Sequence, residues 1–183
     1  MFNKLCLVAA GITLSASVGT ASTAERKDLQ VFNDIAKSVK GYAQFTIFDD
    51  VNAEVKDGVV ALTGRVTMPY KRDEIKRRIA KVDGVHQVRD QITVLPVSRF
   101  DDELRYRIAR SIYGNSNFWN YAATANPSIH IIVEHSRVTL TGVVQSEGDR
   151  RLARALATGF GVLSVTNNLK TDAEVRDALE QSE

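Results

Sequence analysis

An internal repeat constrains the fold of this chain more than any other feature. Three blocks recur in the same order: residues 35–39 as 108–112, 60–66 as 138–144, and 84–92 as 161–169. In the middle block, VALTGRV and VTLTGVV share five of seven residues. Three collinear matches indicate a duplicated structural unit. The second copy carries a five-residue insertion near 123–127.

Each copy opens with the periodicity of an amphipathic helix. Apolar residues at three- and four-residue spacing predict its buried stripe: Leu29, Phe32, Ile35, Ala36 and Val39 in the first copy, and Leu104, Ile108 and Ile112 in the second. Asp28 and Asp101 stand at the start of these stripes. We expect both to cap their helices by accepting a hydrogen bond from a first-turn amide.

Alternating apolar residues predict two strands after each helix, at 51–55 and 59–66 in the first copy and at 129–133 and 137–144 in the second. Lys56-Asp57-Gly58 predicts a tight hairpin turn, and His135-Ser136 occupies the equivalent place. Gly64 and Gly142 are expected to end a strand or to admit a close neighbour. A second helix follows in each copy, with Gly84 or Gly161 predicted as its C-terminal cap, and then a last strand.

The predicted fold class is α+β. Each copy reads helix-strand-strand-helix-strand, which gives a two-layer α/β sandwich with a small mixed sheet. We place the two tandem domains at 28–95 and 100–171, a linker at 96–99 and a C-terminal tail at 172–183. Units of about 70 residues bury modest cores, so we expect the two copies to pack together.

The first 24 residues are typical of a secretory signal peptide. Lys4 precedes an apolar run of about a dozen residues, and Ser22-Thr23-Ala24 fits a small-residue cleavage site. The run is shorter than the ~20 residues that a spanning helix needs. Residues 1–24 are therefore predicted to direct export and to be removed.

These patterns resemble the BON domain, a family found in osmotically induced and nodulation-related bacterial envelope proteins. The motif is a hydrophobic strand, a Gly-x-Val-x-Leu-x-Gly turn and strand, a charged helix and a closing Gly-Val-x-x-Val-x-Asn-x-Leu segment. In the first copy it reads Gly58–Gly64 with Gly84–Val88, and Asp90 and Gln91 stand where the family favours Asn. The second copy carries it at 136–142 and 161–169, with Ser136 in place of the turn glycine. The resemblance implies a non-enzymatic periplasmic module that binds phospholipid or envelope components and supports membrane integrity or stress tolerance.

The composition argues against several chemistries. A formal net charge of +2 does not support nucleic-acid binding by bulk electrostatics, and one Cys with three His cannot build a Cys-ligated zinc site. Neither the histidines nor the paired carboxylates form an acid–base or nucleophilic constellation. We expect no enzyme activity, no catalytic or metal-binding residues, no cofactor and no small-molecule substrate. We predict that His130 faces solvent.

Two features are candidates for membrane binding. Residues 71–81 hold six bases and two acids, from which we select Lys76, Arg77 and Lys81 as headgroup contacts. Trp119 is the second candidate. It aligns with the polar Thr46 of the first copy, whereas its neighbours Phe118 and Tyr121 align with Phe45 and Phe48, so Trp119 is the one aromatic residue of this segment that we expect to be exposed. Arg105, Arg107 and Arg110 lie on the preceding helix and are expected to flank it. The alternatives are a solvated basic face and a tryptophan that covers the junction of the two copies.

The sequence therefore predicts a non-catalytic periplasmic protein that binds an anionic phospholipid surface, peripheral to the outer or inner membrane. The alternative is a protein–protein interaction module that docks to an envelope assembly, which the near-neutral charge favours.

Overall fold

The computed structural model describes residues 19–124 and 126–180. Most of the predicted signal peptide, residues 1–18, lies outside the described residues. The first unit consists of α1 (Gly19–Lys40), β1 (Asp50–Lys56), β2 (Val59–Val66), α2 (Pro69–Ile79) and β3 (Gln87–Val94). The second consists of α3 (Arg99–Tyr113), a 3-10 turn (Ser116–Phe118), α4 (Trp119–Ala122), β4 (Ile129–Glu134), β5 (Arg137–Val144), α5 (Glu147–Ala157), β6 (Ser164–Thr171) and α6 (Asp172–Glu180).

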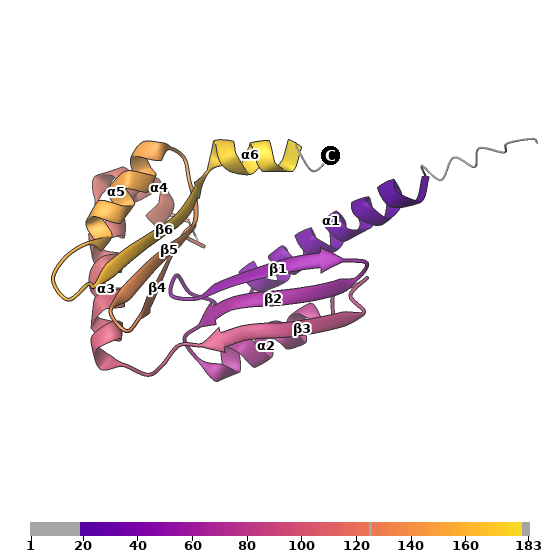
Figure 1. The fold of residues 1–183 in the computed structure, drawn as a ribbon, viewed down its shortest axis with the longest axis horizontal. Helices are drawn as coiled ribbons and strands as arrows, with labels where there is room; N and C mark the ends of the chain where they lie inside the picture. The colour runs from indigo at the N-terminus through magenta and orange to yellow at the C-terminus, as the bar shows by residue number, and fades with distance from the viewer. Residues whose placement is uncertain (1–18, 125, 181–183) are drawn as a thin grey trace, which may run out of the picture.

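Both units have the predicted α+β architecture (Figure 1). Each sheet has three strands, in the orders β1-β2-β3 and β4-β5-β6. The first two strands of each sheet form an antiparallel hairpin, and the third pairs parallel to the second. Two helices cover one face of each sheet, and the apolar residues of that face form one core per unit. The two tandem sandwiches expected from the repeat are confirmed.

The predicted helix caps at Asp28 and Asp101 are wrong. Asp28 lies inside α1, and Ser98 caps α3 by accepting a hydrogen bond from the Asp101 amide at 3.2 Å. Both carboxylates instead bind the hairpin turn of their own unit. Asp101 accepts from the amides of His135 and Ser136, both at 2.9 Å, and Asp28 accepts from the corresponding amides at 57 and 58. All four turn residues have positive φ, as both central residues of a type I′ turn do. The carboxylates of Asp28 and Asp101 therefore bind the backbone amides of these turns.

The glycine predictions are partly right. Gly84 and Gly161 do not cap α2 and α5, which end at Ile79 and Ala157, but lie in the turns that follow, with φ of +89° and +80°. Gly64 and Gly142 lie inside β2 and β5. A Cβ on Gly142 would stand 1.8 Å from the carbonyl oxygen of Ser128, so this glycine admits a close neighbouring segment. Of the two predictions for these glycines, the close neighbour is therefore right and the end of a strand is wrong.

The segment that connects α1 to β1 joins the two units. The amide of Ile131 on β4 donates to the carbonyl of Ile47 at 2.7 Å, and the Phe48 ring meets Tyr106 edge-on with centroids 5.3 Å apart. Ile47 and Phe48 are partly buried and pack against the core of the second unit. Arg65 and Glu134 form an ion pair at 3.3 Å across the same junction.

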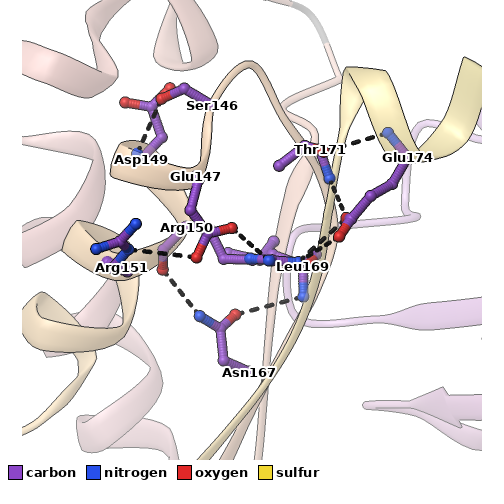
Figure 2. Close-up of polar contacts among 9 residues, drawn as sticks. All are labelled: Ser146, Glu147, Asp149, Arg150, Arg151, Asn167, Leu169, Thr171 and Glu174. Atoms are coloured by element: carbon purple, nitrogen blue, oxygen red, sulfur yellow. Dashed lines mark hydrogen bonds and ion pairs between the residues drawn. The ribbon is translucent and has the colours of Figure 1, made fainter.

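The C-terminal tail folds as a capped helix. Figure 2 shows the reciprocal bonds of a capping box: the Glu174 amide donates to Thr171 Oγ1 at 3.2 Å, and the Thr171 amide donates to the Glu174 carboxylate at 2.8 Å. Arg150 of α5 donates to the same carboxylate at 2.9 Å. Asn167, part of the closing-strand motif, donates to the Arg150 carbonyl at 2.8 Å. The motif residue thus fixes α5 on β6, and α5 in turn fixes α6.

Candidate functional site

Trp119 is exposed, as the comparison of the two copies predicts. Its exposed fraction is 72%, whereas Phe118 is fully buried and Tyr121 is 7% exposed. The difference arises because the 3-10 turn and α4 direct Phe118 and Tyr121 into the core, where their rings lie 5.5 Å apart. Phe45 and Phe48, the counterparts in the first copy, are half-buried and meet the second unit.

The arginines of α3 separate into different roles. Arg105 is only 4% exposed and is not available to a headgroup, which corrects its selection as a flanking residue. It lies on the helix face that packs on the sheet, where it donates to the Val133 carbonyl at 2.6 Å and pairs with Asp102. Arg107 and Arg110 are exposed, and Arg107 donates to the carbonyl of Phe160.

The basic residues near α2 form a smaller patch than the sequence predicts. Lys71 is buried, and Arg77 and Arg78 both pair with Glu74. Lys76 and Lys81 are exposed, and neither forms an ion pair with any residue that the structure describes. Of the three selected residues, Arg77 is exposed but neutralised by its neighbour.

Lys71 belongs to a buried ionic cluster. Its ammonium lies 2.6 Å from the carboxylate of Asp49, which is completely buried. Asp49 also accepts from the amides and hydroxyls of Thr46 and Thr67, at 2.7 to 2.9 Å. Burial alone would raise the pKa of Asp49, but the Lys71 ammonium and the threonine donors outweigh it and hold the pKa below its usual value.

The second unit builds the same connection with other chemistry. The Tyr121 hydroxyl accepts from the Gln145 amide at 2.6 Å and donates to Asp149 at 2.9 Å. Gln145 and Asp149 stand where the first unit has Thr67 and Lys71. Burial raises the pKa of Tyr121 to about 12, and the hydrogen bond to Asp149 acts in the same direction. In each unit, this polar pair anchors the loop before the first strand to the start of the second helix.

An exposed apolar patch, which sequence reasoning missed, lies at one end of the second unit. We call Phe100, Phe160 and Leu163 the apolar tip. Their exposed fractions are 48%, 89% and 72%. Gly161, with its positive φ, turns the α5–β6 loop, which carries Phe160 and Leu163, against Phe100 of α3: a Cβ on Gly161 would lie 2.9 Å from the Phe100 ring.

Two arginines border the apolar tip. Arg107 reaches it through the Phe160 carbonyl. Arg137 is exposed at the start of β5 and pairs with Ser164, next to Leu163 in the chain. Exposed apolar side chains with bordering cations provide both contributions to binding an anionic membrane surface.

The repeat contains the signal that would have found the apolar tip. In the first copy, Phe160 and Leu163 correspond to Asp83 and His86, and Phe100 corresponds to Lys27. The fold therefore accepts charged or polar residues at all three places. The exposed apolar residues of the second copy are not required by the shared architecture.

The histidines stay apart from one another. His86 is exposed beside the first hairpin turn, and His135 lies in the second. His130 is half-buried rather than solvent-facing, because the first unit covers its side of the sheet and the Phe45 ring lies 5.5 Å away. Over residues 19–124 and 126–180, no group of three or more His, Cys, Asp or Glu could hold a metal ion. No helix in the described part of the chain is long and apolar enough to cross a membrane.

A family model described as BON domain matches the chain twice, at residues 33–96 and 106–173. Among solved structures, the chain is similar to CdsD, titled a structural protein of the type III secretion system of Chlamydia trachomatis, at 12% identity and a TM-score of 0.30; the match covers 82% of this chain and 97% of that one. The C-terminal domain of the same protein matches at 11% identity and a TM-score of 0.28, covering 77% and 96%. No curated protein matches the chain.

Proposed function

We propose, from the premise that the chain belongs to the BON domain family, that it is a non-catalytic periplasmic protein. Members of this family are associated with phospholipid and envelope binding. In this proposal, the chain binds anionic phospholipid surfaces through its second domain. The apolar tip is the observation that carries this proposal. Phe160 and Leu163 would enter the interfacial region of the bilayer, and Arg107 and Arg137 would pair with lipid phosphates. Trp119 is proposed as a second contact.

The expected affinity follows from the exposed fractions. Full burial of a Phe or Leu side chain contributes about 1.5–3 kcal/mol, and Phe160 and Leu163 are exposed enough to gain most of it. Each base close to an anionic surface adds about 1 kcal/mol. Peripheral binding that depends on both contributions should need anionic lipid and weaken with salt, because the Debye length falls from ~10 Å at 0.1 M to ~3 Å at 1 M.

Vesicle co-sedimentation tests the proposal, with phosphatidylglycerol-containing vesicles compared with phosphatidylcholine vesicles. The decisive variant carries the first-copy residues, Phe160→Asp with Leu163→His, which the fold accepts in the first unit. It should bind anionic vesicles at least ~10-fold more weakly, since each 1.4 kcal/mol is a factor of ten. Asp83→Asn is the matched control on the first unit and should bind like the wild type.

Equal binding to neutral vesicles, or unchanged binding by the double variant, would contradict the proposal. The alternative of an envelope protein partner would be favoured by a complex from envelope extract that survives detergent and is lost with the double variant.

A further inference from the structure

A cleft at the junction of the two domains is separate from the apolar tip. It measures about 650 Å³ and lies between α1, β1 and the start of β4. Its apolar lining includes Phe32, Ala36, Val39, Phe45, Val51 and Ala53. Asn126, Pro127 and Ser128, at the end of the second-copy insertion and the start of β4, form part of the opposite wall. The volume and the apolar lining are those of a small-molecule site, for which the sequence alone offers no candidate.

The two copies differ in the side chains that could fill this space. Ala53 of β1 pairs with Leu62 of β2, and Ile131 of β4 pairs with Leu140 of β5. Leu62 and Leu140 are equivalent in the repeat, so Ala53 and Ile131 occupy matching positions. At the ends of the first helices, Lys40 stands where the second unit has Tyr113. Tyr113 is half-buried against its core and donates to the Ile129 carbonyl, whereas Lys40 is exposed. The cleft therefore results from smaller or solvated residues in the first copy, not from the fold itself.

The cleft continues as an apolar stripe on α1. Leu29, Phe32, Ala36 and Val39 follow one another at three- and four-residue spacing, so they share one face of the helix. The predicted core role of Leu29 and Phe32 is wrong, since they are 48% and 41% exposed, while Val31 and Ile35 occupy the core. This stripe provides a long, narrow apolar track that enters the cleft from solvent.

Polar atoms in and beside the cleft lack partners. His130 lines it, and its Nδ1 is buried without a hydrogen-bond partner among the described residues. The same holds for Oγ1 of Thr141, which pairs with His130 across the β4–β5 ladder. Buried polar atoms in native proteins nearly always have a partner, from the protein or from ordered water, so His130 Nδ1 and Thr141 Oγ1 have hydrogen-bonding capacity left for a group that enters the cleft.

We infer that the cleft binds one acyl chain of a single-chain amphiphile with an acidic head group, a long-chain fatty acid or a lysophospholipid. The chain would lie along the α1 stripe and between the apolar walls. The carboxylate or phosphate would meet Lys40 and His130, which are two of the polar lining residues; the others are Thr46, Asp50, Asn52, Asn126 and Ser128. Each CH₂ removed from water contributes about 0.8 kcal/mol, so a long chain gains enough for binding in a preformed cleft. This site is independent of the proposed membrane contact.

A fluorescence titration of the full chain with dansyl-labelled undecanoic acid tests the inference. Saturable binding at one probe per chain is expected. Ala36→Trp, which fills the cleft, should weaken binding at least tenfold. Gln30→Trp, at an exposed position of the same helix that is at neither three- nor four-residue spacing from the stripe residues, should stay within twofold. Ala53→Leu narrows the opposite wall and replaces Ala36→Trp if circular dichroism shows that variant to be unfolded. Lys40→Gln and His130→Phe should each weaken binding by a smaller factor.

Displacement distinguishes the two sources of the acyl chain. Unlabelled palmitate that displaces the probe supports a fatty acid, and lysophosphatidylglycerol that displaces it supports a lysophospholipid; displacement by neither would overturn the inference. Equal binding by both cleft variants and the wild type would also overturn it. The Phe160→Asp, Leu163→His variant should retain probe binding, so that loss of vesicle binding and loss of probe binding report on different sites.

Discussion

Replacing Lys71 with Met should destabilise the first domain strongly, because it leaves the buried carboxylate of Asp49 without its counter-ion. The ammonium and the carboxylate lie 2.6 Å apart, with side-chain exposures of 7% and 0%. Removing one partner of such a pair costs about 3–5 kcal/mol, which is a large part of the ~5–15 kcal/mol that stabilises a typical domain. The four donors from Thr46 and Thr67 remain, so we expect Lys71→Met to lower the free energy of unfolding by about 3 kcal/mol, the lower end of this range.

Arg72→Ala is the matched control one residue away. Arg72 pairs with Asp73 on the helix surface, and exposed pairs contribute about 0–1 kcal/mol. Denaturant unfolding should be followed by circular dichroism rather than by fluorescence, because the single Trp119 is exposed in the folded protein and lies in the other domain. A Lys71→Met variant within ~0.5 kcal/mol of Arg72→Ala would refute the assignment of this pair as the anchor of the loop.

The buried cluster of Asp49 and Lys71 also predicts that the first domain loses stability as the pH falls. Since the pKa of Asp49 is lowered in the folded state, its contribution is fully present above its unfolded pKa of ~4 and is lost as pH falls through the folded value. Asp49→Ala lacks this dependence. The difference in free energy of unfolding between wild type and Asp49→Ala should therefore shrink below about pH 4, and a difference that grows in acid would contradict the sign.

Three further predictions concern the second domain. Ser136→Gly should raise the free energy of unfolding by about 1 kcal/mol in denaturant unfolding, because Ser136 holds a φ of +61° that costs a non-glycine residue ~1–2 kcal/mol; a destabilised variant would exclude backbone strain there. Glu174→Ala should remove the capping box and speed amide exchange in α6 with little change in global stability, whereas unchanged exchange would show that the helix does not depend on its cap. Tyr121→Phe should cost about 1–3 kcal/mol, because it leaves the Asp149 carboxylate and the Gln145 amide without the hydroxyl that both bond in a part-buried site. In the wild type, Tyr121 contributes to the free energy of unfolding below its unfolded pKa of ~10, and this contribution is lost as pH rises through its folded pKa of about 12. A spectroscopic titration in which the Tyr121 hydroxyl ionises near pH ~10 in the folded protein would contradict its burial.

The repeat made the architecture predictable before any coordinates. Duplication requires both copies to satisfy one fold, so the strand order and the hairpins follow from patterns that each copy repeats. Comparison of the copies also identified Trp119 as exposed, because a core position would not carry a threonine in one copy and a tryptophan in the other.

Functions of polar residues were harder to predict. Asp28 and Asp101 have the sequence context of helix caps, but their carboxylates reach hairpin turns 29 to 35 residues away, and such pairing depends on tertiary structure. Arg105 looks like a surface base, yet the helix rotation needed to bury Leu104 and Ile108 also turns it toward the sheet. The apolar tip and the cleft share this cause, since both are formed by segments that meet only in the folded chain.

The most direct test of the membrane-binding account is the environment of the α5–β6 loop when vesicles are present. Cys6 is the only cysteine in the sequence and lies in the predicted signal peptide, so the processed chain has no other thiol. A single environment-sensitive label can therefore be placed at Gly159→Cys, where the structure leaves open space, or at Asp83→Cys on the matching loop of the first domain. Anionic vesicles should shift the emission of the label at 159 to that of an apolar environment and leave the emission of the label at 83 unchanged. A label at 159 that stays in water while the protein is bound to vesicles would contradict the proposed membrane contact.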